Sequence, residues 1–308
     1  MKKQTRYRLE AAAVAVVATV ARILPRRVLF GFGEILGGMW AALDGRHRRI
    51  AADNLRQAFP DWDEARILSV ARGVYLHFAK TVLDVLWMDR LSVDEMMDFA
   101  DVEGRQYFEA AVASGRGVIL PTGHIGNWEF QGVAVKEQWR SIGVIARPLD
   151  NPLLDARLDA FRSKGGNAVI SKRRALSDTL RIIRGGGGVA VLVDQNVQAK
   201  DGIFVDFFGR AACTTTVAAA IAVKTGCILL PGYCPRMPDG RYKLIYGPPI
   251  EWQPSGSREK DIRELTQRIT SVIEGWVREW PEQWLWIHRR WKTQPSTPAV
   301  PSPGERAS

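Results

Sequence analysis

The stretch Gly117-Val-Ile-Leu-Pro-Thr-Gly-His-Ile-Gly-Asn-Trp-Glu-Phe130 has the pattern of a strand, a turn and the beginning of a helix. Residues 118–120 form a short apolar run of the kind found in buried strands. Gly123 and Gly126 provide the backbone freedom that a tight turn needs, and Asn127 is a suitable N-cap for the helix after it. A strand that leads through a turn into a helix is the repeating unit of an α/β sheet.

The same alternation continues along the rest of the chain. Short apolar, β-branched runs predict strands, and helical patterns lie between them. The expected strands cover residues 117–120, 142–147, 189–194, 228–230 and 242–246, and the expected helices cover 127–139, 152–164, 175–184, 214–225 and 258–279. Two more helices are expected upstream, at 49–59 and 63–87. We therefore predict an α/β fold with a mixed, largely parallel central sheet flanked by helices, and functional groups at the strand ends.

The composition is that of an ordinary folded protein. Of the 308 residues, 46% are hydrophobic and 25% are charged, which argues against general disorder. The three cysteines cannot form a disulfide framework, and none has CxxC spacing, so we expect a reducing compartment and no zinc finger. No His, Cys, Asp and Glu grouping has convincing metal-ligand spacing, and we expect neither a metal nor a cofactor. The sequence contains no recognisable nucleic-acid-binding module, and no nucleic-acid partner is expected.

Positive charge is concentrated at the start of the chain, whose formal net charge is +10. Residues 1–50 hold ten Lys and Arg against three Asp and Glu, a net charge of +7. The same segment has two apolar stretches, 11–21 and 28–43, both shorter than the ~20 residues of a spanning helix. Basic and apolar residues together favour an anionic membrane surface. Two arrangements stay open: an interfacial hairpin of two helices with Pro25 at the turn, or one tilted anchor helix.

We therefore divide the chain into three parts. Residues 1–45 are predicted to be a membrane-associated helical segment, 46–292 the main α/β domain, and 293–308 a disordered tail with four prolines. If the basic ends stay in the cytoplasm, the positive-inside tendency places the body there as well.

His124 and Glu129 are the candidates for chemistry in the opening stretch. Five positions on one helix separate side chains by about 140°, so His124 must lie in the turn if it cooperates with Glu129 on the first helical turn. A neutral imidazole steadied by a carboxylate can act as a general base toward a hydroxyl. No Ser or Cys lies beside His124, so direct attack by a substrate hydroxyl is favoured over a covalent enzyme. Taken alone, the pattern also fits a histidine that merely caps the helix.

The chain as a whole resembles the lysophospholipid acyltransferase superfamily, and within it the bacterial lipid A lauroyl/myristoyl acyltransferases (HtrB/MsbB-like), a family that includes phosphatidylinositol mannoside acyltransferases. The resemblance spans roughly residues 45–292 in family order. It rests on the blocks at 54–60, Thr122-Gly-His-Ile-Gly-Asn-Trp-Glu129, 147–151, Asp194-Gln195, 202–209 and Pro281-Glu-Gln-Trp-Leu-Trp-Ile-His-Arg-Arg290.

The resemblance implies transfer of a fatty acyl chain from acyl carrier protein, or from CoA, to a hydroxyl of a lipid A precursor. It makes His124 the catalytic base and Glu129 its acidic partner, with Asp194, at the end of a predicted strand, as the alternative partner. Arg147 is expected to bind a phosphate or the oxyanion. The expected substrate-binding residues are Asn127, Gln195, Gly202, Phe204, Phe207, Arg289 and Arg290.

Several alternatives stay open beside this interpretation. The acceptor could be a phosphatidylinositol mannoside or another glycolipid, and the same base could serve a thioesterase-like lipid hydrolase. A non-catalytic lipid-binding protein is the third alternative, and the intact His124–Glu129 pair argues against it. The tryptophans near the C-terminal end suit either a membrane interface or core packing, and His47 and His77 are expected to be structural.

Overall fold

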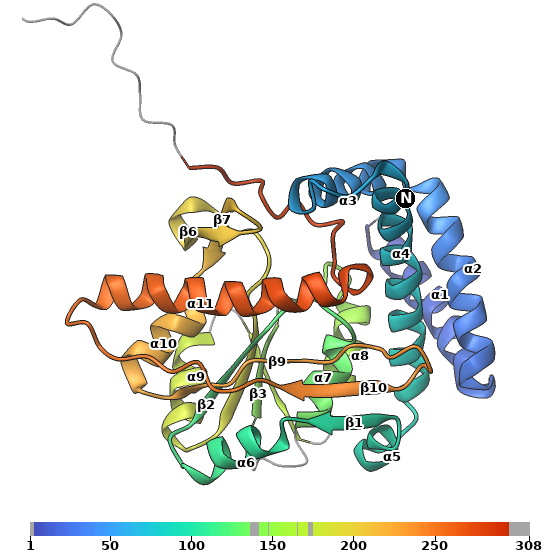
Figure 1. Ribbon diagram of the computed structural model, residues 1–308. Helices are drawn as coiled ribbons and strands as arrows, with labels where there is room; N and C mark the ends of the chain where they lie inside the picture. The colour runs from blue at the N-terminus through green and yellow to red at the C-terminus, as the bar shows by residue number, and fades with distance from the viewer. Residues whose placement is uncertain (1–2, 136–141, 147, 165, 172–174, 296–308) are drawn as a thin grey trace, which may run out of the picture.

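The computed structural model describes residues 3–135, 142–146, 148–164, 166–171 and 175–295 (Figure 1). At its centre is a five-stranded sheet in the order β4-β3-β5-β2-β8, and every neighbouring pair in it is parallel. The strands are β2 (Val118–Thr122), β3 (Ile142–Ala146), β4 (Ala168–Ser171), β5 (Gly188–Leu192) and β8 (Ile228–Leu229). The predicted α/β class is therefore confirmed, with a central sheet that is wholly parallel.

Helices cover both faces of this sheet (Figure 1). Alternate β2 residues point to opposite sides, so Ile119 joins one hydrophobic core while Val118 and Leu120 join the other. The flanking helices are α6 (Arg105–Ala113), α7 (Trp128–Ala134), α8 (Pro152–Arg162), α9 (Ala175–Arg184), α10 (Val217–Thr225) and α11 (Arg258–Glu279). The predicted helix at 127–139 can be compared only as far as residue 135, because 136–141 lie outside the described residues.

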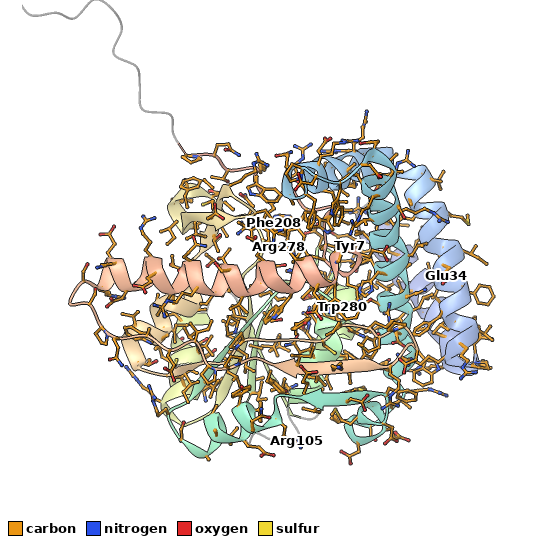
Figure 2. All side chains as sticks on the ribbon, in the orientation of Figure 1. Tyr7, Glu34, Arg105, Phe208, Arg278 and Trp280 are labelled. Atoms are coloured by element: carbon orange, nitrogen blue, oxygen red, sulfur yellow. The ribbon has the colours of Figure 1, made fainter. Side chains whose placement is uncertain are left out.

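Two smaller β structures correct the sequence prediction. The predicted strand at 242–246 is β10 (Tyr242–Tyr246), which belongs to a separate sheet with β1 (Ala100–Glu103) and β9 (Gly232–Tyr233). The strands β6 (Gly202–Phe207) and β7 (Arg210–Thr215) form an antiparallel hairpin, so α10 begins at Val217 and not at residue 214. Phe208, at the hairpin turn, is covered by the Arg278 guanidinium of α11, 4.4 Å from its ring centroid (Figure 2).

The N-terminal region consists of two helices that pack on a third. These are α1 (Lys3–Ile23) and α2 (Arg26–Leu43), and α4 (Glu64–Met88) is their common partner. Gly37 brings α2 close to α4, because a Cβ atom there would lie 2.7 Å from Leu76 Cα. The chain breaks at Pro25, as the hairpin alternative requires, and the single-helix alternative is wrong. No described helix is both long enough and apolar enough to cross a membrane.

Two further helices lie between the N-terminal region and the first strand. The short helices α3 (Gly45–Ala58) and α5 (Val93–Met97) lie before and after α4, and α3 and α4 confirm the helices expected at 49–59 and 63–87. Asp63 caps α4 by accepting a hydrogen bond from the Arg66 amide.

Candidate active site

Register within the parallel sheet places His124 beside Asp194. Strands β2 and β5 are neighbours, and Thr122 is paired with Leu192 at their carboxyl ends. His124 follows Thr122 by two residues, and Asp194 follows Leu192 by two residues, so both emerge at the same edge of the sheet. The carboxyl edge of a parallel sheet is where α/β proteins usually place their functional groups.

Asp194 is the hydrogen-bonded partner of His124. His124 Nδ1 lies 2.8 Å from Asp194 Oδ1, and the His124 amide donates to Asp194 Oδ2 at 2.7 Å. The Trp284 indole donates to the same Oδ2 at 2.8 Å. An ionised carboxylate can only accept, so the proton of a neutral imidazole resides on Nδ1 and the lone pair on Nε2.

Burial and charge act in opposite directions on this pair. Burial lowers the pKa of His124, but the charge and hydrogen bond of Asp194 outweigh it, and the pKa lies above its ordinary value. Burial has the opposite effect on Asp194 and raises its pKa, but His124 and the donated hydrogen bonds outweigh burial and lower the pKa to about 2. The carboxylate therefore remains ionised near neutral pH and stabilises the imidazolium that a general base becomes.

The open side of the imidazole is lined by a few polar and aromatic groups. His124 keeps 18% of its side chain exposed, against 1% for Asp194, and Nε2 is the ring nitrogen that does not bond Asp194. Gln195 Nε2 lies 3.4 Å from His124 Nε2, and the Trp128 ring meets the imidazole edge-on at 5.2 Å between centroids. A hydroxyl at this position could give up its proton to His124 Nε2.

Glu129 has a different partner from the one the sequence suggested. It lies on the first turn of α7, as expected, but its carboxylate receives two hydrogen bonds of 2.7 Å from Arg162 of α8. Trp128 Nε1 donates a third at 3.1 Å. Among the described residues no hydrogen bond joins Glu129 to His124. The acid that bonds His124 is therefore Asp194, the alternative partner, and not Glu129, the partner that was expected first. The bidentate guanidinium is the physical reason, because it occupies both carboxylate oxygens.

Several residues expected to bind substrate are enclosed by protein. Asn127 is fully buried and caps α7 by accepting from the Phe130 amide, while its Nδ2 donates to Tyr242. Arg290 is 1% exposed and donates to Cys213 O and Thr214 Oγ1. Phe207 is 1% exposed and packs on Trp284. In this structure the side chains of these three residues contact protein groups, and their predicted role in substrate binding stays a prediction.

The other candidates lie near the hairpin or on the surface. Phe204 lines an open groove of about 560 Å³ between β6 and α11, together with Lys260 and Arg263. Gly202 begins β6, where a Cβ atom would lie 2.4 Å from Thr214 O, so the missing side chain allows close pairing with β7. Arg289 is exposed. Arg147 lies outside the described residues.

Sequence reasoning missed how the C-terminal segment supports the site. Trp284 and Trp286 are buried and stack edge to face at 4.6 Å, so core packing is the correct interpretation of these tryptophans. The Asn196 amide donates to His288 Nε2 at 2.9 Å, and Asn54 donates to the carbonyls of Trp286 and His288. The blocks around residues 54, 194 and 288 were all visible in the sequence, but their mutual contact was not.

The sequence is similar to known proteins along nearly its whole length. A family model described as "Bacterial lipid A biosynthesis acyltransferase" matches residues 1–293. The lipid A biosynthesis lauroyltransferase of Escherichia coli (strain K12) is 29% identical over 304 residues, covering 96% of this chain and 95% of that protein. The lipid A biosynthesis palmitoleoyltransferase of the same strain is 27% identical, covering 88% and 87%. The phosphatidylinositol mannoside acyltransferase of Mycolicibacterium smegmatis is 23% identical, covering 73% and 72%.

Proposed function

Since the chain belongs to the bacterial lipid A biosynthesis acyltransferase family and is an O-acyltransferase, we propose that it acylates a hydroxyl of a lipid A precursor, using the thioester of acyl carrier protein, or of CoA, as donor. The observation that carries the mechanism is the His124–Asp194 pair at the carboxyl edge of the sheet, in which the His124 ring is partly exposed and its Nε2 does not bond Asp194. The proposal requires no metal or other cofactor.

The reaction follows from that geometry as a direct transfer. His124 Nε2 takes the proton of the acceptor hydroxyl while its oxygen attacks the thioester carbonyl carbon. The tetrahedral intermediate then loses the carrier sulfur, the C–S bond breaks, and the thiolate receives the proton from Nε2. The products are an ester on the lipid and a free carrier thiol. Asp194 holds the imidazole in place throughout and balances its charge. Gln195, beside Nε2, is the candidate to orient the reacting groups, and Arg147 and Arg289 stay candidates for phosphate or oxyanion contacts.

Mass spectrometry of lipids from the source bacterium, with the gene deleted and then restored, tests the acceptor. We expect lipid A from the deletion strain to lack one acyl chain and the restored strain to regain it, because an ester transfer adds one acyl mass. The mass difference also identifies the chain length.

Other results, from that experiment or from an assay of the purified protein, would identify the alternative functions. A mass change confined to a mannosylated phosphatidylinositol or another glycolipid would replace the proposed acceptor. Purified protein that releases free fatty acid in preference to acylated lipid would identify a thioesterase-like hydrolase. If no lipid changes mass, the proposal of acyl transfer to lipid A is wrong.

The outer faces of α1 and α2 support a second part of the proposal, docking on the cytoplasmic face of the inner membrane. Exposed apolar residues on α2 repeat at helical spacing along one face, at Val28, Phe32, Ile35, Leu36, Met39 and Leu43. The one acid of α2, Glu34, is paired with Lys80 of α4 at 2.7 Å. Exposed arginines lie at both ends of the helix, with Arg27 at its start and Arg46 just beyond its end. An apolar face between cations fits an anionic lipid surface.

Leu36→Glu is expected to weaken binding to vesicles of phosphatidylglycerol and phosphatidylethanolamine by about tenfold or more, since burying one Leu is worth about 1.5–3 kcal/mol. Co-flotation with the vesicles measures the effect. Leu176→Glu is the matched control, because Leu176 is 57% exposed on α9 and Leu36 is 47% exposed on α2. Equal flotation of the two variants would show that the α1–α2 face is not the docking surface.

A further inference from the structure

We propose that His77 of α4 is a positioning residue that holds the loop of His124 in its reactive geometry through a hydrogen bond to the Gly126 carbonyl. The inference builds on the proposed role of His124 as base. His77 Nε2 lies 3.0 Å from Gly126 O, and Gly126 follows His124 by two residues. His77 lies on α4, whereas His124 lies in the loop that follows strand β2 of the central sheet, so this contact joins two parts of the molecule.

The loop from residue 123 to 127 is held by its backbone on every side. The His124 carbonyl accepts from the Leu285 amide, and the Gly126 amide donates to Gln283 O at 3.1 Å. The Asn127 amide donates to Cys234 O at 2.8 Å. The Gly126 carbonyl is the group that none of these backbone contacts satisfies, and His77 supplies its donor. Gly126 has φ +65°, and a Cβ atom there would lie 2.0 Å from Cys234 O, so the loop has no room to shift toward that side.

Arg236 determines which nitrogen of His77 carries the proton. Its Nη1 lies 3.3 Å from His77 Nδ1, and a guanidinium can only donate, so Nδ1 must accept. The proton of the neutral ring is therefore on Nε2, where the Gly126 carbonyl requires a donor. Burial and the Arg236 cation both hold the pKa of His77 well below its ordinary value, so the ring stays neutral.

Arg236 is itself fixed by a buried network. Its Nη2 donates to Thr81 Oγ1 at 2.9 Å and to Tyr242 Oη at 3.0 Å, and Thr81 in turn donates to the His77 carbonyl. Tyr242 donates to Asp84, which also accepts two hydrogen bonds from Arg26 at the start of α2. A fully satisfied network of this kind rigidifies the groups that it joins. His77 is thus held in one rotamer and one tautomer, as a positioning group must be.

The consequence for His124 is geometric. The Asp194 carboxylate accepts from both the amide and the ring of His124, so a shift of the loop would lengthen both bonds. A misplacement of about 1 Å at a reacting group can cost about 10²-fold in rate. The same shift would weaken the interaction that raises the pKa of His124.

The test compares two substitutions at His77 in the full-length protein. His77→Leu removes the donor, whereas His77→Gln keeps an N–H near the position of Nε2. We expect His77→Leu to lower kcat by about 10- to 100-fold with KM changed less than about twofold, and His77→Gln to recover most of the loss. Trp87→Phe is the control for general damage to α4, because Trp87 is buried on the same helix and bonds Leu24 O, away from the loop.

A titration followed by nuclear magnetic resonance of labelled histidine gives a second readout that needs no turnover. The chain has four histidines, so the His124 signal can be assigned by substitution. We expect its pKa to fall in His77→Leu and to return in His77→Gln, while Trp87→Phe leaves it in place.

An unchanged His124 pKa and kcat in His77→Leu would overturn the proposal, as would equal losses in the Leu and Gln variants. This readout stays informative even if His124→Ala retains turnover. In that case the proposed mechanism fails, while the positioning of the His124 ring is still measured directly.

Discussion

His124→Ala is expected to lower kcat for acyl transfer by about 10³-fold or more, because general-base catalysis contributes about 10²–10⁴-fold and the dyad acts as a unit. The fold should be preserved, since the backbone amide and carbonyl of residue 124 keep their bonds to Asp194 and Leu285. Turnover with acyl carrier protein thioester and a lipid A precursor measures the effect, and circular dichroism checks the fold.

His47→Ala serves as the matched histidine control. His47 is 45% exposed on α3 and pairs with Asp44, away from the sheet edge, so its loss should leave kcat within about twofold. If His124→Ala retained more than about a tenth of the original kcat, the base would be another group and the proposed mechanism would be wrong.

Asp194→Asn is expected to lower kcat by about 10²–10⁴-fold and to change its dependence on pH. His124 acts when neutral, so kcat/KM should rise as pH increases through its pKa, which Asp194 holds above the ordinary value of about 6.5. Without the carboxylate charge, burial dominates and lowers that pKa. The acid limb of the profile should therefore move to lower pH in the variant.

Glu129→Gln distinguishes the two acids that the sequence offered. Glu129 bonds Arg162 and acts on His124 only through its charge, so its removal should move the acid limb less than Asp194→Asn does. The opposite ranking in kcat/KM profiles measured side by side would restore Glu129 as the principal partner.

The local patterns of the sequence predicted the main elements well. The run from Val118 through Asn127 was recognised as strand, turn and capped helix because each step depends on neighbouring residues. The same holds for the long helix α4, whereas the break at Pro25 was only one of two open alternatives and the structure decided between them. The strands β1, β4 and β9 and the β6–β7 hairpin were missed, because the pattern of so short a run does not by itself distinguish a strand from other structure.

The residues of the site could therefore be predicted from the sequence, but their hydrogen-bond partners could not. His124, Glu129 and Asp194 could each be named from motifs, and the sequence by itself determined that a histidine would stand at a strand end with acids available. Only the tertiary structure decided which acid pairs with it. Register between β2 and β5 brings Asp194 to His124 across 70 positions, and Arg162 occupies Glu129 across 33. Hydrogen-bond partners are chosen by distance across strands and helices, and that distance is a property of the packed chain, which no local spacing encodes.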